Sequence, residues 1–425
     1  MDPWPLVDMH VHIFRDDLAR VSAGDVLPSA AARRLAVSRD PVGLWRTSMT
    51  SQRLGDLEPL TRQPLRLSRN RVYRLWRGGA VLDRFQGQPD PADANTPEEW
   101  VGSTTVSRLP GRPADEGLST VRLPDGSSIV LKDLIEAFPR AMLGESHAAR
   151  LGPDLGVLCK LLDSAMRLPI QCHPDAAFAR RHLGSNFGKT EAWLILATRS
   201  IHGVPPYMLF GFREGVTETA FRRSVRAQDV TAQIASLNRV EVEPGDLYLV
   251  SAGTPHALGP GIFMIEIQEP TDLVVNTEYT FHGLRRTEAQ CYLGLGFDLG
   301  MSCFNYQAVG DAYLSQHRLT PRTLRDDSAG MEERLIGPDH TPCFGMDRVT
   351  VRDRLSDGDR GRCYIAIVTE GQGRLTGARD DFPVRAGDTF FVPAASEHAA
   401  VEAKPGESLR LIKCFPPDLR GGPWS

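Results

Sequence analysis

The feature that most constrains the fold is a short pattern that occurs twice in the chain. A Gly-Asp dipeptide at residues 245–246 opens an apolar segment, and His256 follows the glycine by eleven positions. A second Gly-Asp dipeptide at residues 387–388 opens a similar segment, and His398 again follows by eleven positions. Because Gly-Asp suits the tight turn of a β-hairpin, the pattern predicts two β-barrels or jelly rolls built from short strands. A chance match is the alternative to duplication.

The spacing of apolar residues places helices inside this β-rich framework. Helical periodicity predicts helices at residues 131–142, 155–166 and 217–237, and β-type patterns predict strands at residues 168–173 and 191–198. From residue 240 the chain alternates short strands and turns almost to its end. The expected fold is therefore mainly β, with a helical insertion.

Three segments are expected along the chain. They are an N-terminal extension of unknown role at residues 1–60, a first barrel at 61–300 with helical insertions at about 131–168 and 213–238, and a second barrel at 301–425.

Side chains in the first barrel suit a single divalent metal. Gln171 and His173 are two residues apart, so both leave the same face of a strand. Lys189 and Glu191 repeat this spacing at the start of an apolar run, and His256 adds a second imidazole. Mixed imidazole, carboxylate and amide ligands suit zinc, with iron, manganese or cobalt as alternatives. Two ordinary buried histidines, hydrogen-bonded to the backbone, are the competing interpretation.

The second copy of the pattern lacks part of this set. Residues 365–374 contain no histidine, so nothing there matches Gln171 and His173. The second barrel is therefore predicted to be degenerate.

Composition excludes several classes of function. The 425-residue chain has a formal net charge of −4 and no basic run interleaved with aromatics, so nucleic acid is not an expected partner. No apolar stretch approaches the length that spans a bilayer, and the N-terminus lacks the pattern of a secretory signal. Seven cysteines without a CxxC pair predict reduced thiols and a cytoplasmic protein, with Cys172 pointing away from the metal. Oligomeric state is left open.

Three motifs carry a family resemblance. Gln-x-His-Pro-Asp at residues 171–175, Gly-Lys-Thr-Glu-x-Trp at 188–193 and Gly-Thr-Pro-His-Ala at 253–257 resemble, in that order, the type I phosphomannose isomerases of the cupin superfamily. The likeness spans residues 64–415 and includes the segments at 72–79 and 98–100. It implies two cupin domains and a zinc enzyme that interconverts an aldose phosphate and a ketose phosphate. The metal ligands that it implies are Gln171, His173, Glu191 and His256. Trp76, in the first of those segments, is a candidate for substrate binding.

Two residues are candidates for the base that moves a proton between C1 and C2 of the sugar. Lys189 lies two residues from a proposed metal ligand, and a surface ion pair is its alternative role. Glu266 lies in an alternating segment at 263–269, on the same face as Gln268, and matches a glutamate of the family's active site. A solvent-facing strand position is its alternative role.

The chain departs from the family pattern where the phosphate is expected. Pro169 stands where the family has a serine two residues before the glutamine ligand, and it offers neither hydroxyl nor amide donor. Asp272 is kept, but Asn276 replaces an arginine that would grip phosphate with two hydrogen bonds. Asp272, Asn276 and the nearby Arg285 are candidates for substrate binding. The sugar is therefore mannose 6-phosphate, a different sugar phosphate or an unphosphorylated sugar.

Two other hypotheses compete with this one. A non-catalytic or regulatory cupin that binds a sugar would share the metal site. His10 and His12 form a His-x-His pair like the opening motif of amidohydrolase barrels, but the chain has too few helical crossovers for that fold.

Overall fold

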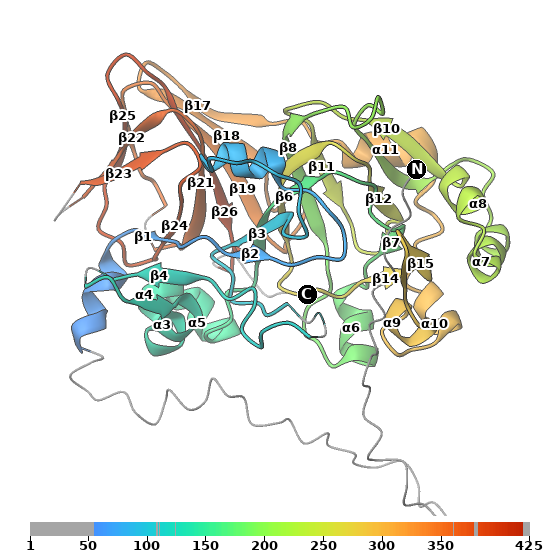
Figure 1. Cartoon of the computed structure of the whole chain (residues 1–425). Helices are drawn as coiled ribbons and strands as arrows, with labels where there is room; N and C mark the ends of the chain where they lie inside the picture. Colours follow the sequence, from blue (N-terminus) through green and yellow to red (C-terminus); the bar gives the residue numbers. More distant parts are fainter. Residues whose placement is uncertain are drawn as a thin grey trace, which may run out of the picture. The chain divides into compact units, whose positions relative to one another are not determined.

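The structure is a computed structural model that describes residues 55–419, apart from positions 108, 110, 124, 360 and 378–380. These residues lie within one compact unit, Ser51–Ser425. They form two β-barrels, each made from two main antiparallel sheets (Figure 1). The prediction of a mainly β fold with two cupin barrels is confirmed.

The first barrel contains a six-stranded and a five-stranded sheet. The larger sheet has, in spatial order, β11 (Leu247–Val250), β8 (Glu191–Thr198), β13 (Ile262–Gln268), β6 (Leu158–Ser164), β3 (Glu98–Val101) and β2 (Arg71–Val72). The smaller has β10 (Leu237–Glu241), β9 (Tyr207–Phe212), β12 (His256–Leu258), β7 (Gln171–Cys172) and β14 (Val275–Asn276).

The core of this barrel lies between its two sheets. Trp193 and Ile195 of β8 and Met264 of β13 meet Phe210 of β9 there. Trp193 and Ile195 leave the same face of β8 because alternate residues of a strand point the same way. Cys172 points outward, into a second apolar cluster that packs against helices, as predicted. All seven cysteines are free thiols.

Helices are inserted between the strands, and most of them lie in two predicted insertions or in short single segments. The first insertion is α3 (Leu131–Ala137), α4 (Pro139–Leu143) and α5 (Glu145–Leu151), and the second is α7 (Glu218–Ala227) and α8 (Val230–Ala235). The remaining helices are η2 (Glu58–Arg62), α2 (Ala80–Phe85), α6 (Ala176–Leu183), α9 (Glu288–Cys291), α10 (Phe297–Met301) and α11 (Gly310–His317). Among the described residues, no helix has the length and apolar character needed to cross a membrane.

The predicted helix at residues 155–166 is wrong, because this segment contains strand β6. Every residue of β6 is buried. A strand that is covered on both faces carries apolar residues at adjacent positions, and this pattern cannot be told from a helix by periodicity alone. The helix predicted at 131–142 is instead split at Phe138, because Pro139 disfavours helical geometry in the residue before it.

The second barrel contains a seven-stranded and a four-stranded sheet. The larger has β1 (Leu65–Arg66), β24 (Thr389–Val392), β21 (Tyr364–Glu370), β26 (Leu409–Phe415), β19 (Gly345–Val351), β18 (Gly330–Ile336) and β17 (Arg322–Asp326). The smaller has β20 (Arg354–Ser356), β25 (Ala400–Ala403), β22 (Gln372–Thr376) and β23 (Phe382–Arg385). Short hairpins β4 (Thr120–Arg122) with β5 (Ser128–Val130), and β15 (Thr280–Phe281) with β16 (Leu284–Arg285), complete the fold.

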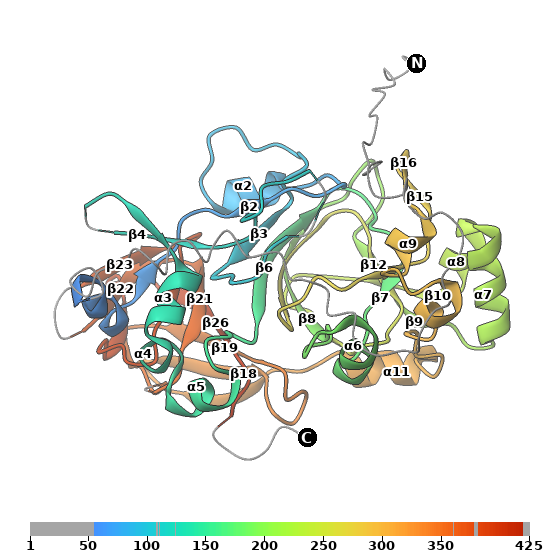
Figure 2. The ribbon, with the colours of Figure 1, turned by 90° about the horizontal axis from the view of Figure 1, so that it is seen from below.

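Strand β1 crosses to the second barrel, whereas helix α11 covers the first. Strand β1 precedes the first barrel in sequence, yet it pairs with β24 of the second barrel. Helix α11 follows the first barrel's strands and packs against β9 and β11. Figure 2 shows this helix on the side of the first barrel near β9. The predicted segment boundaries at residues 60 and 300 stay a prediction.

Candidate metal centre and active site

Three predicted metal ligands converge inside the first barrel. His256 on β12 lies opposite Gln171 on β7 in the same ladder, and His173 follows β7 by one residue. Glu191 begins β8 in the facing sheet. One ligand atom from each of His173, Glu191 and His256 lies within 4.8 Å of the other two. The three side chains are therefore close enough to share one ion.

Backbone carbonyls fix the orientation of both imidazoles. His173 Nδ1 lies 2.9 Å from the carbonyl oxygen of Leu273, and His256 Nδ1 lies 2.8 Å from that of Thr254. If each Nδ1 donates its proton, each Nε2 keeps a free lone pair. Each Nε2 lies 3.4 Å from a different oxygen of Glu191. This outer hydrogen bonding is typical of metal-ligating histidines.

The electrostatics keep these groups in the protonation states that metal ligands need. Burial lowers the pKa of His173, and the nearby Lys189 ammonium lowers it further. Burial lowers the pKa of His256 to about 3, against the opposing effect of Glu191. Burial alone would raise the pKa of Glu191, but Lys189 and the two imidazoles hold it well below its usual value. At neutral pH the set is two neutral imidazoles and a carboxylate.

A cation already contacts these atoms. The Lys189 ammonium lies 2.9 Å from Glu191 Oε2 and 3.0 Å from His173 Nε2. The amide nitrogen of Gln171 lies 3.2 Å from His256 Nε2. The residues present therefore fit a divalent metal, because their lone pairs converge on a point where positive charge is favourable.

A line of buried charges extends from this centre. Glu266 on β13 accepts a 2.9 Å hydrogen bond from Lys160, its neighbour on β6. Arg74 donates to Glu98 at 2.8 Å and to Asp272 at 3.3 Å. Burial raises the pKa of the Glu266 carboxyl, although Lys160 opposes that rise. A carboxyl with a raised pKa is suited to taking and returning a proton.

Sequence reasoning missed Arg74, Glu98 and Lys160 as members of this line. Lys160 interrupts a run of buried apolar residues, and a lone cation at such a place is a usable signal. The wrong helix at 155–166 hid the alternation that puts Lys160 opposite Glu266.

The four predicted substrate-binding residues lie in different environments. Asn276 is opposite Gln171 in the β7–β14 ladder, and Asp272 directly precedes the carbonyl that orients His173. Trp76 is buried in the barrel core. Arg285 lies on the exposed hairpin strand β16. The structure brings Asp272 and Asn276 to the metal ligands and leaves Arg285 on the surface.

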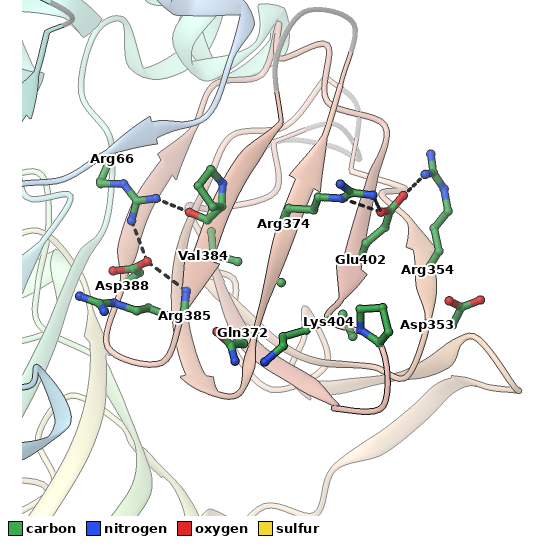
Figure 3. A pocket seen from close by; sticks show the side chains of 14 residues that line it. Arg66, Asp353, Arg354, Gln372, Arg374, Val384, Arg385, Asp388, Glu402 and Lys404 are labelled. Carbon is green, nitrogen blue, oxygen red and sulfur yellow. Dashed lines mark hydrogen bonds and ion pairs between the residues drawn. The ribbon is translucent and has the colours of Figure 1, made fainter.

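A groove of about 980 Å³ lies on the second barrel, over the four-stranded sheet (Figure 3). Five of its charged side chains pair with one another: Arg66 lies 2.7 Å from Asp388, while Arg354 and Arg374 both contact Glu402. None of the predicted site residues lines this groove. The pair His10 and His12 lies outside the described residues.

Comparison with known proteins places the chain in a family. No family model matches the chain. "Probable mannose-6-phosphate isomerase GmuF" of Bacillus subtilis is 34% identical over 326 residues, covering 76% of this chain and 90% of the relative. "Mannose-6-phosphate isomerase ManA" of the same organism is 24% identical over 304 residues, covering 69% and 89%.

Solved structures share the fold. The crystal structure of mannose 6-phosphate isomerase from Bacillus subtilis aligns with a TM-score of 0.64 at 22% identity, covering 83% of this chain and all of the other. A zinc-bound mannose 6-phosphate isomerase aligns with a TM-score of 0.61 at 17% identity, covering 84% of this chain and all of the other. Together with the relative at 34% identity, the matching fold leads to one assignment: this chain belongs to the mannose-6-phosphate isomerase family of isomerases.

Proposed function

We propose that the protein is a metal-dependent aldose–ketose isomerase that converts mannose 6-phosphate, or a related sugar, to the corresponding ketose. The observation that carries the proposal is the meeting of His173, Glu191 and His256 inside the first barrel. The names of the relatives and the presence of zinc in one structure of the same fold support it.

Zinc is the metal that we propose, with His173, Glu191 and His256 as ligands and the Gln171 amide as the fourth. Two imidazoles and a carboxylate are a common zinc set, and an amide oxygen leaves the ion electrophilic. A zinc ion held there would act as a Lewis acid on the sugar carbonyl.

Glu266 is the base in this proposal. Isomerisation removes the proton from C2 and delivers one to C1 through an enediol, so one group has to accept and return a proton. The Lys160 ammonium holds Oε1 of Glu266 at 2.9 Å, which fixes the carboxyl inside the barrel. Lys189 is assigned a positioning role, because its ammonium contacts Glu191 and His173.

One observation favours a second candidate substrate, an unphosphorylated sugar. Lys189, Lys160 and Arg74 are each paired with a buried carboxylate. Beside the metal ligands the neutral Asn276 side chain is 8% exposed. An amide binds a sugar hydroxyl well, but it offers a phosphate no charge.

Asn276→Arg is expected to shift preference toward the phosphorylated sugar. A new charge-assisted pair with phosphate is worth about 1.5–3 kcal/mol, so kcat/KM for mannose 6-phosphate over mannose should rise roughly tenfold or more. Steady-state kinetics on both sugars measure the ratio. Asn276→Gln, which keeps the amide, is the control. If this ratio rose equally in both variants, we would conclude that Asn276 does not recognise the substrate.

The reaction itself is tested with metal-loaded protein in deuterated water. Mannose 6-phosphate, fructose 6-phosphate and mannose are incubated separately, and NMR follows ketose formation and deuterium at C1 and C2. Turnover of one sugar that stops on chelation and returns with zinc is the expected result. Saturable sugar binding without any turnover would instead favour a non-catalytic cupin.

A further inference from the structure

One turn of the first barrel contacts both candidate imidazole ligands. This turn, at residues 251–254, lies between β11 and β12, and its Gly253 N–H donates to the carbonyl oxygen of His173 at 2.8 Å. The next carbonyl oxygen along the chain, that of Thr254, lies 2.8 Å from His256 Nδ1. A 3.0 Å hydrogen bond from the Thr254 N–H to the first carbonyl oxygen of the turn closes it. The position of the turn therefore bears on the placement of both imidazoles.

Helix α11 holds this turn through two side-chain contacts. Thr254 is fully buried, and its Oγ1 lies 2.6 Å from Tyr313 Oη. Ser251 Oγ lies 3.2 Å from His317 Nε2, while His317 Nδ1 lies 2.8 Å from the Tyr313 carbonyl oxygen. Tyr313 and His317 are four residues apart on the helix and share one face, where their ring centroids stack at 3.9 Å. One face of α11 thus contacts both ends of the turn.

The segment at residues 303–305 provides a further anchor. The Asn305 N–H donates to the Gly253 carbonyl oxygen at 2.8 Å. Gly253 has a φ of +84°, and a Cβ added there would lie 3.1 Å from both the Cys303 carbonyl oxygen and Asn305 Cβ, so glycine permits this close approach. The turn is therefore fixed by hydrogen bonds to three segments: His173, residues 303–305 and α11.

We propose that Tyr313 is a positioning residue of the metal centre, which acts on His256 through Thr254. The inference rests on the proposed function, because it takes His256 as a metal ligand. Tyr313 Oη holds the Thr254 side chain, and the carbonyl of the same residue orients the imidazole. An imidazole that is already oriented loses less rotational freedom when it binds an ion. Helix α11, which precedes β17 of the second barrel, therefore adjusts the affinity of the first barrel for its metal.

Tyr313→Phe tests the proposal, because it removes the hydroxyl and keeps the ring that packs against His317 and Phe210. Competition with a chromophoric chelator measures the zinc dissociation constant of the full chain. Loss of an outer hydrogen-bond partner typically weakens metal binding about 10–100-fold, and Tyr313 acts one bond farther away, so we expect a loss of about tenfold. If the hydroxyl only attached α11 to the barrel, the melting temperature would fall and the zinc affinity would stay unchanged.

Two control variants separate positioning from a general loss of packing. Tyr306 is a half-buried tyrosine whose hydroxyl donates to the Met301 carbonyl oxygen at 3.3 Å rather than to the turn. Tyr306→Phe should therefore melt slightly below the parent chain and bind zinc as the parent does. Thr254→Ser keeps the hydroxyl that contacts Tyr313 and should also keep the parent's zinc affinity.

Thr254→Val removes the same hydrogen bond from its other end, so it should weaken zinc binding as much as Tyr313→Phe. Both changes together should cost about tenfold and not about a hundredfold, because they break one shared bond. Unchanged zinc affinity in folded Tyr313→Phe, an equal loss in Tyr306→Phe, or multiplied losses in the double variant would overturn the proposal. A parent chain that binds no zinc would overturn the proposed function and, with it, this inference.

Discussion

His256→Ala is expected to remove the metal and abolish isomerisation while most of the fold survives. The imidazole is fully buried, and its Nε2 lies 3.4 Å from Glu191 and 3.2 Å from Gln171, so its loss breaks the ligand set at its centre. Truncation also leaves a small cavity, at a cost of about 1–3 kcal/mol. Elemental analysis of the purified variant, with turnover of the best substrate, measures both effects.

His147→Ala is the matched control. His147 is also a buried histidine bonded to a backbone carbonyl, that of Asp154 at 2.7 Å, but it lies on α5 in the helical insertion. This variant should lose comparable stability and keep both metal and activity. If His256→Ala retained the parent's metal content, the ligand assignment would be wrong.

Glu266→Gln is expected to lower kcat by about 10²–10⁴, the usual contribution of a positioned general base. Glutamine has the same shape and still accepts a hydrogen bond from Lys160, so the effect isolates the loss of a group that can take the C2 proton. Metal content and KM should change little, because Glu266 is not among the clustered ligands. Rapid-mixing kinetics on metal-loaded protein give kcat.

The control for this variant is Glu99→Gln. Glu99 is a buried carboxyl on β3 of the same sheet, and it lies near Arg69 and Arg71 rather than Lys160. Suppose that kcat is nearly normal in Glu99→Gln and strongly reduced in Glu266→Gln. The loss would then come from the Glu266 carboxylate in particular and not from removing any buried carboxylate of this sheet. A kcat for Glu266→Gln within a fewfold of the parent would point to Lys189 as the base.

Sequence alone predicts the elements whose bounds depend on the pattern of neighbouring residues. Strand β8 has the bounds that the apolar run after Glu191 predicts, residues 191–198. The ligand pair Gln171 and His173 follows from two-residue spacing on a strand. The helix prediction at 155–166 is wrong because both faces of β6 are buried, so apolar residues stand at adjacent positions and their spacing also fits a helix.

Partners that are far apart in the chain cannot be predicted from local sequence. Lys160 and Glu266 are 106 residues apart on paired strands, and Arg74 and Asp272 are 198 apart in two loops. The residues around each position do not indicate its partner, because the register of the strands is set by the whole sheet. The sequence indicates Arg74 and Glu98 only as members of two segments that resemble the family. The charged line beside the metal ligands therefore appears only in the folded chain.

The pairing of β1 with the second barrel has a consequence for any attempt to produce the first barrel alone. A fragment that stops near residue 300 would carry β1 without its partner β24, and it would lack the helix that covers β9 and β11. Unpaired edge strands with exposed apolar faces invite association between copies. We therefore expect a fragment that carries only the first barrel to aggregate, whereas the second barrel keeps these strands covered in the full chain.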